Sequence, residues 1–66
     1  MSRGKVRTRH EYRINKKGAE CFRTDDLETC RAKLEELNSK RPIYTMQYRT
    51  MHYGGYIDNP HWSSWR

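Results

Sequence analysis

The chain has 66 residues, a formal net charge of +6 and a mean hydropathy of −1.29. This length allows one domain with a small core, and no segment approaches the roughly 18 apolar residues of a membrane span. The N-terminal residues lack the apolar region of a secretory signal, and two cysteines are too few for a disulfide framework. We therefore expect a cytoplasmic protein with free thiols.

The positive charge is concentrated in the first third of the chain. Residues 1–23 contain eight Lys or Arg and two Glu, whereas residues 24–66 have no net charge. A concentrated basic segment attracts anionic partners, whereas evenly distributed charge mainly improves solubility. The alternative is that this segment is simply the solvated face of a strand.

Residues 5–14 alternate between two kinds of side chain and predict a half-buried β-strand. One face would be largely apolar and the other rich in arginine. Residues 15–18 predict a turn that ends in a left-handed glycine, followed by a second strand at residues 19–23. The register expected from this turn pairs Asn15 with Ala19, Tyr12 with Phe22, and Glu11 with Arg23.

Residues 25–40 predict an amphipathic helix. Thr24 or Asp25 can cap its start, and Glu28 would complete a capping box with Asp25. The apolar seam consists of Leu27, Cys30, Leu34 and Leu37. Arg31 and Glu35 are expected to pair on the solvent side. Cys30 would face the core, and Cys21 would lie on the opposite face of the sheet.

Residues 43–53 are rich in tyrosine, threonine and methionine and predict a third strand. Tyr44, Met46 and Tyr48 would share one face, with Met51 and Tyr53 on the other. A short fourth strand could follow at residues 56–57, before an aromatic tail at residues 58–66.

These elements predict a small two-layer α+β domain with the order β-β-α-β. The expected sheet is antiparallel with strand order 2-1-3, because the third strand returns beside the first. The helix would cover the face that carries Tyr12 and Phe22. The arginines would lie on the other face.

The arginine-rich face predicts binding to a polyanion, above all to nucleic acid. The planar guanidinium group can donate two hydrogen bonds to a phosphate, and an antiparallel ribbon can follow a nucleic-acid backbone. Arg3 could extend the charge at the N-terminus. The candidate phosphate contacts are Lys5, Arg7, Arg9, Arg13, Lys16, Lys17 and Arg23.

The aromatic C-terminal third supports a second hypothesis. Exposed tryptophan and tyrosine can stack on bases or anchor a protein interface. The candidates are Tyr48, Met51, Tyr53, Trp62 and Trp65. The chain would then be an inhibitor or adaptor of a larger host protein, as small phage accessory proteins are, with an acidic protein surface or a second copy as its partner. Alternatively, a tryptophan only covers the core.

The sequence gives no basis for enzymatic activity. No His or Cys pair has the spacing of a zinc site, and the serines near the C-terminus do not lie in a nucleophile elbow. A chain of this size also has little material for an enclosed active site. We therefore predict no catalytic residues, no metal and no cofactor.

Overall fold

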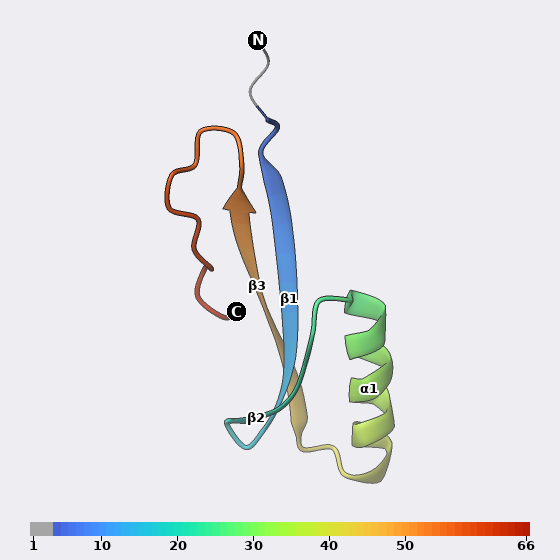
Figure 1. Ribbon diagram of the computed structural model, residues 1–66. Coiled ribbons are helices and arrows are strands. Elements are labelled where there is room, and N and C mark those ends of the chain that lie inside the picture. The colour runs from blue at the N-terminus through green and yellow to red at the C-terminus, as the bar shows by residue number, and fades with distance from the viewer. Residues whose placement is uncertain (1–3) are drawn as a thin grey trace.

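The computed structural model describes residues 4–66, so Arg3 lies outside the described residues. Its elements are β1 (Arg7–Lys16), β2 (Ala19–Thr24), α1 (Leu27–Lys40) and β3 (Tyr44–Tyr53). The sheet is antiparallel with the order β2-β1-β3, and α1 lies on one side of it (Figure 1). The predicted small α+β domain is confirmed. Residues 56–57, the site of the possible fourth strand, do not form a strand.

The hairpin turn is shorter than predicted. Only Lys17 and Gly18 connect β1 to β2, with φ angles of 51° and 85°. Two successive positive φ angles are typical of a two-residue type I′ turn, whose twist matches that of the strands. Lys16 therefore pairs with Ala19, and the predicted pairing of Asn15 with Ala19 is wrong.

The ladder between β1 and β2 contains a β-bulge at Cys21. The pairs on either side of it are Ile14 with Phe22 and Asn15 with Glu20. The predicted pairs Tyr12 with Phe22 and Glu11 with Arg23 are also wrong, since Thr24 faces Tyr12 and Arg13 faces Arg23. The extra residue shifts the alternation of side chains along β2. Glu20 and Arg23 therefore lie on the same face although they are three residues apart.

The core lies between α1 and the half of the sheet next to the hairpin. Ile14 and Cys30 are completely buried there, whereas Cys21 is exposed, as predicted. Figure 1 shows α1 beside only the lower half of the long β1–β3 pair, and the domain measures 54 Å along its longest axis. The upper half of the sheet therefore has no helix over it. Within residues 4–66, no helix has the length and apolar character needed to cross a membrane.

The start of α1 differs from the predicted capping box. Asp26 is the N-cap, and its side chain accepts a 2.5 Å hydrogen bond from the Thr29 hydroxyl without capping a backbone N–H. Thr24 acts one residue earlier, since its hydroxyl oxygen accepts a hydrogen bond from the Asp26 N–H at 3.2 Å. The predicted caps at Thr24 and Asp25 are therefore wrong. The helix therefore begins at Leu27, directly after the turn closed by the hydrogen bond between Thr24 and Asp26.

The C-terminal tail runs along the edge of β3 that faces away from β1. Tyr48 and Arg66 exchange backbone hydrogen bonds of 3.2 and 2.9 Å. The Ser63 N–H donates to the Thr50 carbonyl at 2.8 Å, and the Ser63 hydroxyl accepts from the Thr50 N–H. Figure 1 shows the tail descending beside β3. The tail is thus an ordered part of the fold.

Candidate nucleic-acid interface

The tail covers part of the face predicted to bind phosphate. Trp65 lies 4.2 Å from the guanidinium carbon of Arg13 and 4.4 Å from that of Arg49, measured to the ring centroid. Trp62 lies 4.7 Å from Arg49, and Arg23 reaches Trp65 at 5.5 Å. Guanidinium groups at these distances attract the negative face of the indole ring. We call these five residues the arginine–tryptophan cluster.

Two glutamates neutralise most of the charge of this cluster. Glu11 accepts hydrogen bonds of 2.5 and 2.9 Å from Arg49 and lies 3.5 Å from Arg23. Glu20 accepts from Arg23 at 2.6 Å and lies 3.6 Å from Arg13. The hydrogen bond from Arg23 lowers the pKa of Glu20 and also raises the pKa of Arg23. The three arginines therefore already have carboxylate and aromatic partners.

Arg49 was absent from the predicted set, although its alternation on the third strand could have placed it there. It faces Glu11 across the sheet and lies between Gln47 and Met51 on the arginine side. Gln47 accepts hydrogen bonds from Arg13 at 2.8 and 3.0 Å and from the amide of Asn15 at 2.6 Å. Arg13, Asn15 and Gln47 thus form a linked polar network, in which the buried Asn15 Oδ1 accepts no hydrogen bond from the described residues.

A second part of the same face remains open. Lys5, Arg7 and Arg9 are exposed, and within the described residues they take part in no ion pair. Arg7 pairs across the sheet with Tyr53, and Arg9 with Met51. Both partners are half-buried. We call Lys5, Arg7 and Arg9 the basic strip.

The edge of β1 beside the basic strip has no strand paired to it. Pairing with β2 begins only at Tyr12. Because Thr50 directs its backbone groups to the tail, His10 opposite it must direct its own away from β3. The same geometry holds for Thr8. The backbone groups of Thr8 and His10 therefore have no backbone partner among the described residues.

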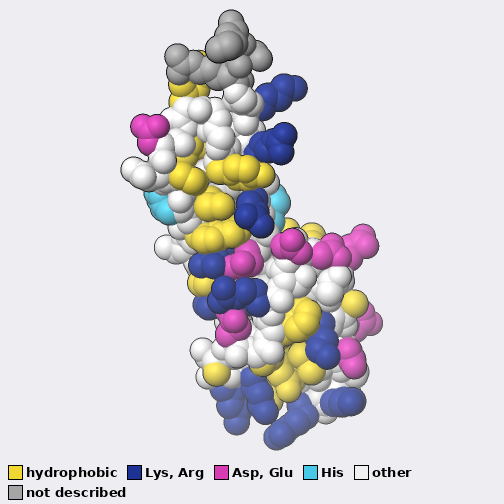
Figure 2. Space-filling model, viewed as in Figure 1, with side chains coloured by type: hydrophobic (Ala, Val, Ile, Leu, Met, Phe, Trp, Pro, Cys, Tyr) yellow, Lys and Arg dark blue, Asp and Glu magenta, His cyan; other side chains and the backbone are white. Residues whose placement is uncertain are grey.

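The remaining predicted cations lie at the far end of the molecule. Lys16 and Lys17 form the hairpin tip, and Lys40 and Arg41 end the helix near it. Figure 2 shows dark-blue side chains gathered at this lower end without acidic ones among them. We call these four residues the basic end. Nine residues of strand separate it from Arg7, a distance of roughly 30 Å.

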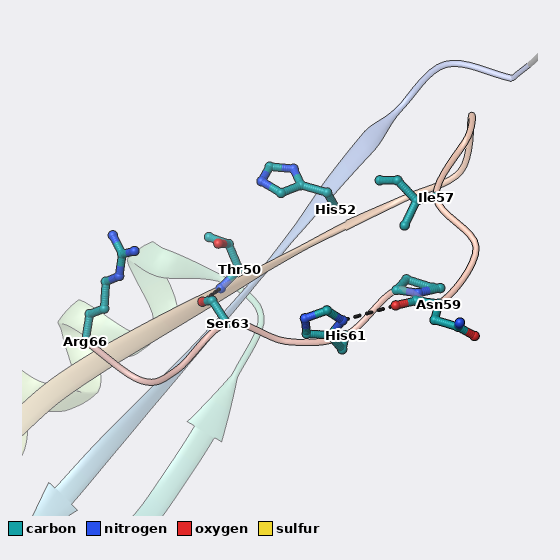
Figure 3. Close-up of a pocket in the computed structure, with 8 residues that line it drawn as sticks. Thr50, His52, Ile57, Asn59, His61, Ser63 and Arg66 are labelled. Carbon is teal, nitrogen blue, oxygen red and sulfur yellow. Dashed lines mark hydrogen bonds between the residues drawn. The ribbon is translucent and has the colours of Figure 1, made fainter.

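The uncovered half of the helix-bearing face contains two adjoining grooves. The first, of about 360 Å³, lies between β3 and the tail and is lined by Thr50, His52, Ile57, Asn59, Pro60, His61, Ser63 and Arg66 (Figure 3). The second, of about 350 Å³, lies beside the start of α1 and is lined by His10, Tyr12, Leu27, Arg31, Met46, Tyr48 and Thr50. Both include Thr50, and no Asp or Glu lines either one. We call the two grooves together the open sheet surface.

Aromatic rings are accessible on this surface. Tyr48 is 41% exposed, and the rings of His10 and Tyr12 lie stacked with centroids 6.4 Å apart. Arg31 does not form the predicted ion pair with Glu35, and the helix instead has a pair between Lys33 and Glu36. The guanidinium of Arg31, which forms no ion pair within the described part of the chain, lines the same groove as the rings.

The predicted stacking residues thus lie on different surfaces. Tyr48 lies on the open sheet surface, whereas Met51 and Tyr53 lie beside the basic strip. Trp62 and Trp65 pack on the arginines. The sequence prediction missed His10 and Arg31 as neighbours of Tyr48. The place of His10 depends on the register of β1 with β3, and that of Arg31 depends on where α1 begins relative to the sheet.

The chemistry of the remaining reactive side chains is limited. Within residues 4–66, no three His, Cys, Asp or Glu side chains come together in a group that could hold a metal ion. Burial raises the pKa of the Cys30 thiol, which keeps this group protonated at neutral pH. Comparison of the chain with known protein families, curated proteins and solved structures finds no match.

Proposed function

We propose that this protein is a small nucleic-acid-binding module whose main phosphate contacts are Lys5, Arg7 and Arg9. The observation that supports this function is the difference between the two arginine groups on one face. The three arginines of the cluster have carboxylate partners, whereas those of the basic strip have none among residues 4–66. A guanidinium without a carboxylate partner can bind phosphate without first breaking an ion pair.

The free edge of β1 adds to this site. The N–H groups of Thr8 and His10 point outward between the side chains of the basic strip, and backbone N–H groups are common phosphate ligands. The basic end lies roughly 30 Å from Arg7 along β1, so a ligand held on the basic strip and the free edge need not contact it. We therefore assign the phosphate contacts to the basic strip.

The test compares two double variants that remove the same charge. Arg7→Ala/Arg9→Ala removes two proposed contacts, and Lys40→Ala/Arg41→Ala removes two cations at the basic end. Each contact to a single strand contributes about 0.7 to the slope of log K against log salt. Loss of two contacts should lower the slope by about 1.4 and the affinity about 25-fold near 0.1 M salt.

Binding is measured by fluorescence anisotropy of a labelled oligonucleotide between about 50 and 200 mM salt. We expect the control variant to keep the slope of the wild type and to lose little affinity. An equal loss in both variants would mean that the domain responds only to total charge. Absence of binding by the wild type at low salt would rule out the proposed function.

The free edge of β1 also favours a second candidate function. An extended segment of a partner protein could pair with Thr8 and His10 as an additional strand, and an acidic segment would suit Arg7 and Arg9. The domain would then be the interaction module considered from sequence, acting through β1 instead of the tryptophans. An acidic peptide that binds equally well to the wild type and to Arg7→Ala/Arg9→Ala would exclude this candidate.

A further inference from the structure

We infer that the open sheet surface binds the bases of a single-stranded nucleic acid, with Tyr48 and the His10–Tyr12 pair as stacking groups and Arg31 as a phosphate contact. This inference rests on the proposed function and specifies its ligand. The basic strip alone could serve any polyanion. The opposite face adds aromatic rings, and among nucleic acids only one with unpaired bases can stack on them.

The first argument is the combination of side chains around Tyr48. Tyr48 is 41% exposed halfway along β3, in the groove beside the start of α1. The stacked rings of His10 and Tyr12 lie on the neighbouring strand. Flat rings on a sheet surface are how several single-strand-binding domains hold bases, because every base has a π-face.

The second argument is charge. Neither groove of the open sheet surface includes an acidic side chain, although the chain contains eight Asp or Glu. Arg31 lies beside the aromatic rings, and Arg66 lies at the tail side (Figure 3). In the described part of the chain, neither arginine forms an ion pair. A phosphate between bases would therefore meet two arginines, and no acidic side chain lines the grooves themselves.

The third argument is the position of the two surfaces relative to each other. Arg7 and Arg9 alternate along β1 with Thr8 and His10, so the basic strip and the rings lie on opposite faces of one strand. The edge between them is not paired to another strand. A flexible single strand can cross this edge, with phosphates on the strip and bases on the rings. A duplex cannot, because its bases are already stacked and paired.

The experiment compares an oligothymidylate of about 12 nucleotides with a duplex of the same length. Tyr48→Ala should weaken binding of the single strand about 5- to 150-fold, which corresponds to the usual loss of one base–aromatic stack, and should leave duplex binding unchanged. Tyr48→Phe keeps the ring and should bind as the wild type does. Far-UV circular dichroism checks that each variant is folded.

A matched pair of helix-region variants tests the role of Arg31. Arg31→Ala should lower the affinity for the single strand about fivefold near 0.1 M salt, whereas Arg41→Ala removes the same charge at the basic end and should have little effect. The inference is overturned if Tyr48→Ala, still folded, binds the single strand as the wild type does, or if the duplex binds as tightly as the single strand. In either case Arg7→Ala/Arg9→Ala still decides the proposed function separately.

Discussion

Replacement of Trp65 by alanine tests how much the tail contributes to the fold. The indole lies 4.2 Å from the Arg13 guanidinium carbon and 4.4 Å from that of Arg49. Each stack contributes about 0.5–1 kcal/mol at a partly exposed site. Half-burial of the side chain removes roughly 100 Å² of apolar surface from water, worth about 2.5 kcal/mol. We expect Trp65→Ala to lower the free energy of unfolding by about 3.5–4.5 kcal/mol.

This loss is large for a domain of 66 residues. A core of this size seldom supplies more than about 3–5 kcal/mol, so the variant should be close to half-unfolded in water. Urea unfolding followed by far-UV circular dichroism measures the change without relying on the deleted fluorophore. Trp65→Phe keeps a ring over the two guanidinium groups, so its free energy of unfolding should fall by less than that of Trp65→Ala. A decrease below about 1 kcal/mol for Trp65→Ala would refute the reasoning, since neither the stacks nor the burial would then be effective.

Three further predictions follow from individual contacts. Because the pKa of Glu20 is lowered in the folded state, its ion pair with Arg23 stabilises the fold above pH 4.5. This stabilisation is lost as the pH falls from 4.5 through the lower folded-state pKa. The urea concentration at the unfolding midpoint should decrease over this pH range, and Glu20→Gln should make the midpoint depend less on pH. The Asn38 side chain bonds both the N–H and the carbonyl of Tyr44 at 3.0 and 3.2 Å, so Asn38→Ala should cost about 1–2 kcal/mol in chemical unfolding, and an unchanged midpoint would contradict this role. Lys17 has a φ of 51°, so Lys17→Asn should stabilise the hairpin by up to about 1 kcal/mol and raise the melting temperature, whereas a lower one would contradict the turn assignment.

The strand order could be predicted because alternation is a local property that the fold preserves. Residues 7–16 and 44–53 each keep a period of two along their whole length, and they pair without a shift. The hairpin register was harder to predict, because it depends on a few turn residues and not on a long alternating pattern. Asn15 and Gly18 fit a four-residue turn, but Asn15 continues β1 and is buried, so a lysine takes the left-handed position instead. Tertiary burial outweighs the local preference for turn residues.

The bulge at Cys21 could not be predicted from the sequence for a related reason. A one-residue shift costs little locally, and its benefit lies in side-chain contacts across the hairpin. It places Glu20 beside Arg13 and Arg23 on one face, where the three side chains form two ion pairs. Without the bulge, Glu20 would still face Asn15, but Phe22 would face Arg13, and Arg23 would point toward the helix-bearing face, away from Glu20.

The sequence predicted the residues of the candidate site, but not that they divide into the arginine–tryptophan cluster and the basic strip. Alternation places Arg7, Arg9 and Arg13 on one face, and nothing in that pattern distinguishes them. The difference comes from the tail, which has no periodicity and reaches Arg13 from 52 residues further along the chain. Contacts of this range depend on the finished sheet. The sequence therefore indicates a basic face, whereas the fold decides which of its cations are available.

The tail also decides which aromatic rings can receive a base. A ring of Trp65 with guanidinium groups against it already has its negative face occupied, so a base would have to displace Arg13 or Arg49 before it could stack there. Tyr48 requires no such exchange, because its exposed ring lies in the groove on the other face. The same tail pairs with the backbone of Tyr48 along the outer edge of β3. Because arginines cover the ring of Trp65 and Tyr48 is exposed, the single strand that we propose as the ligand would be directed toward the free edge of β1.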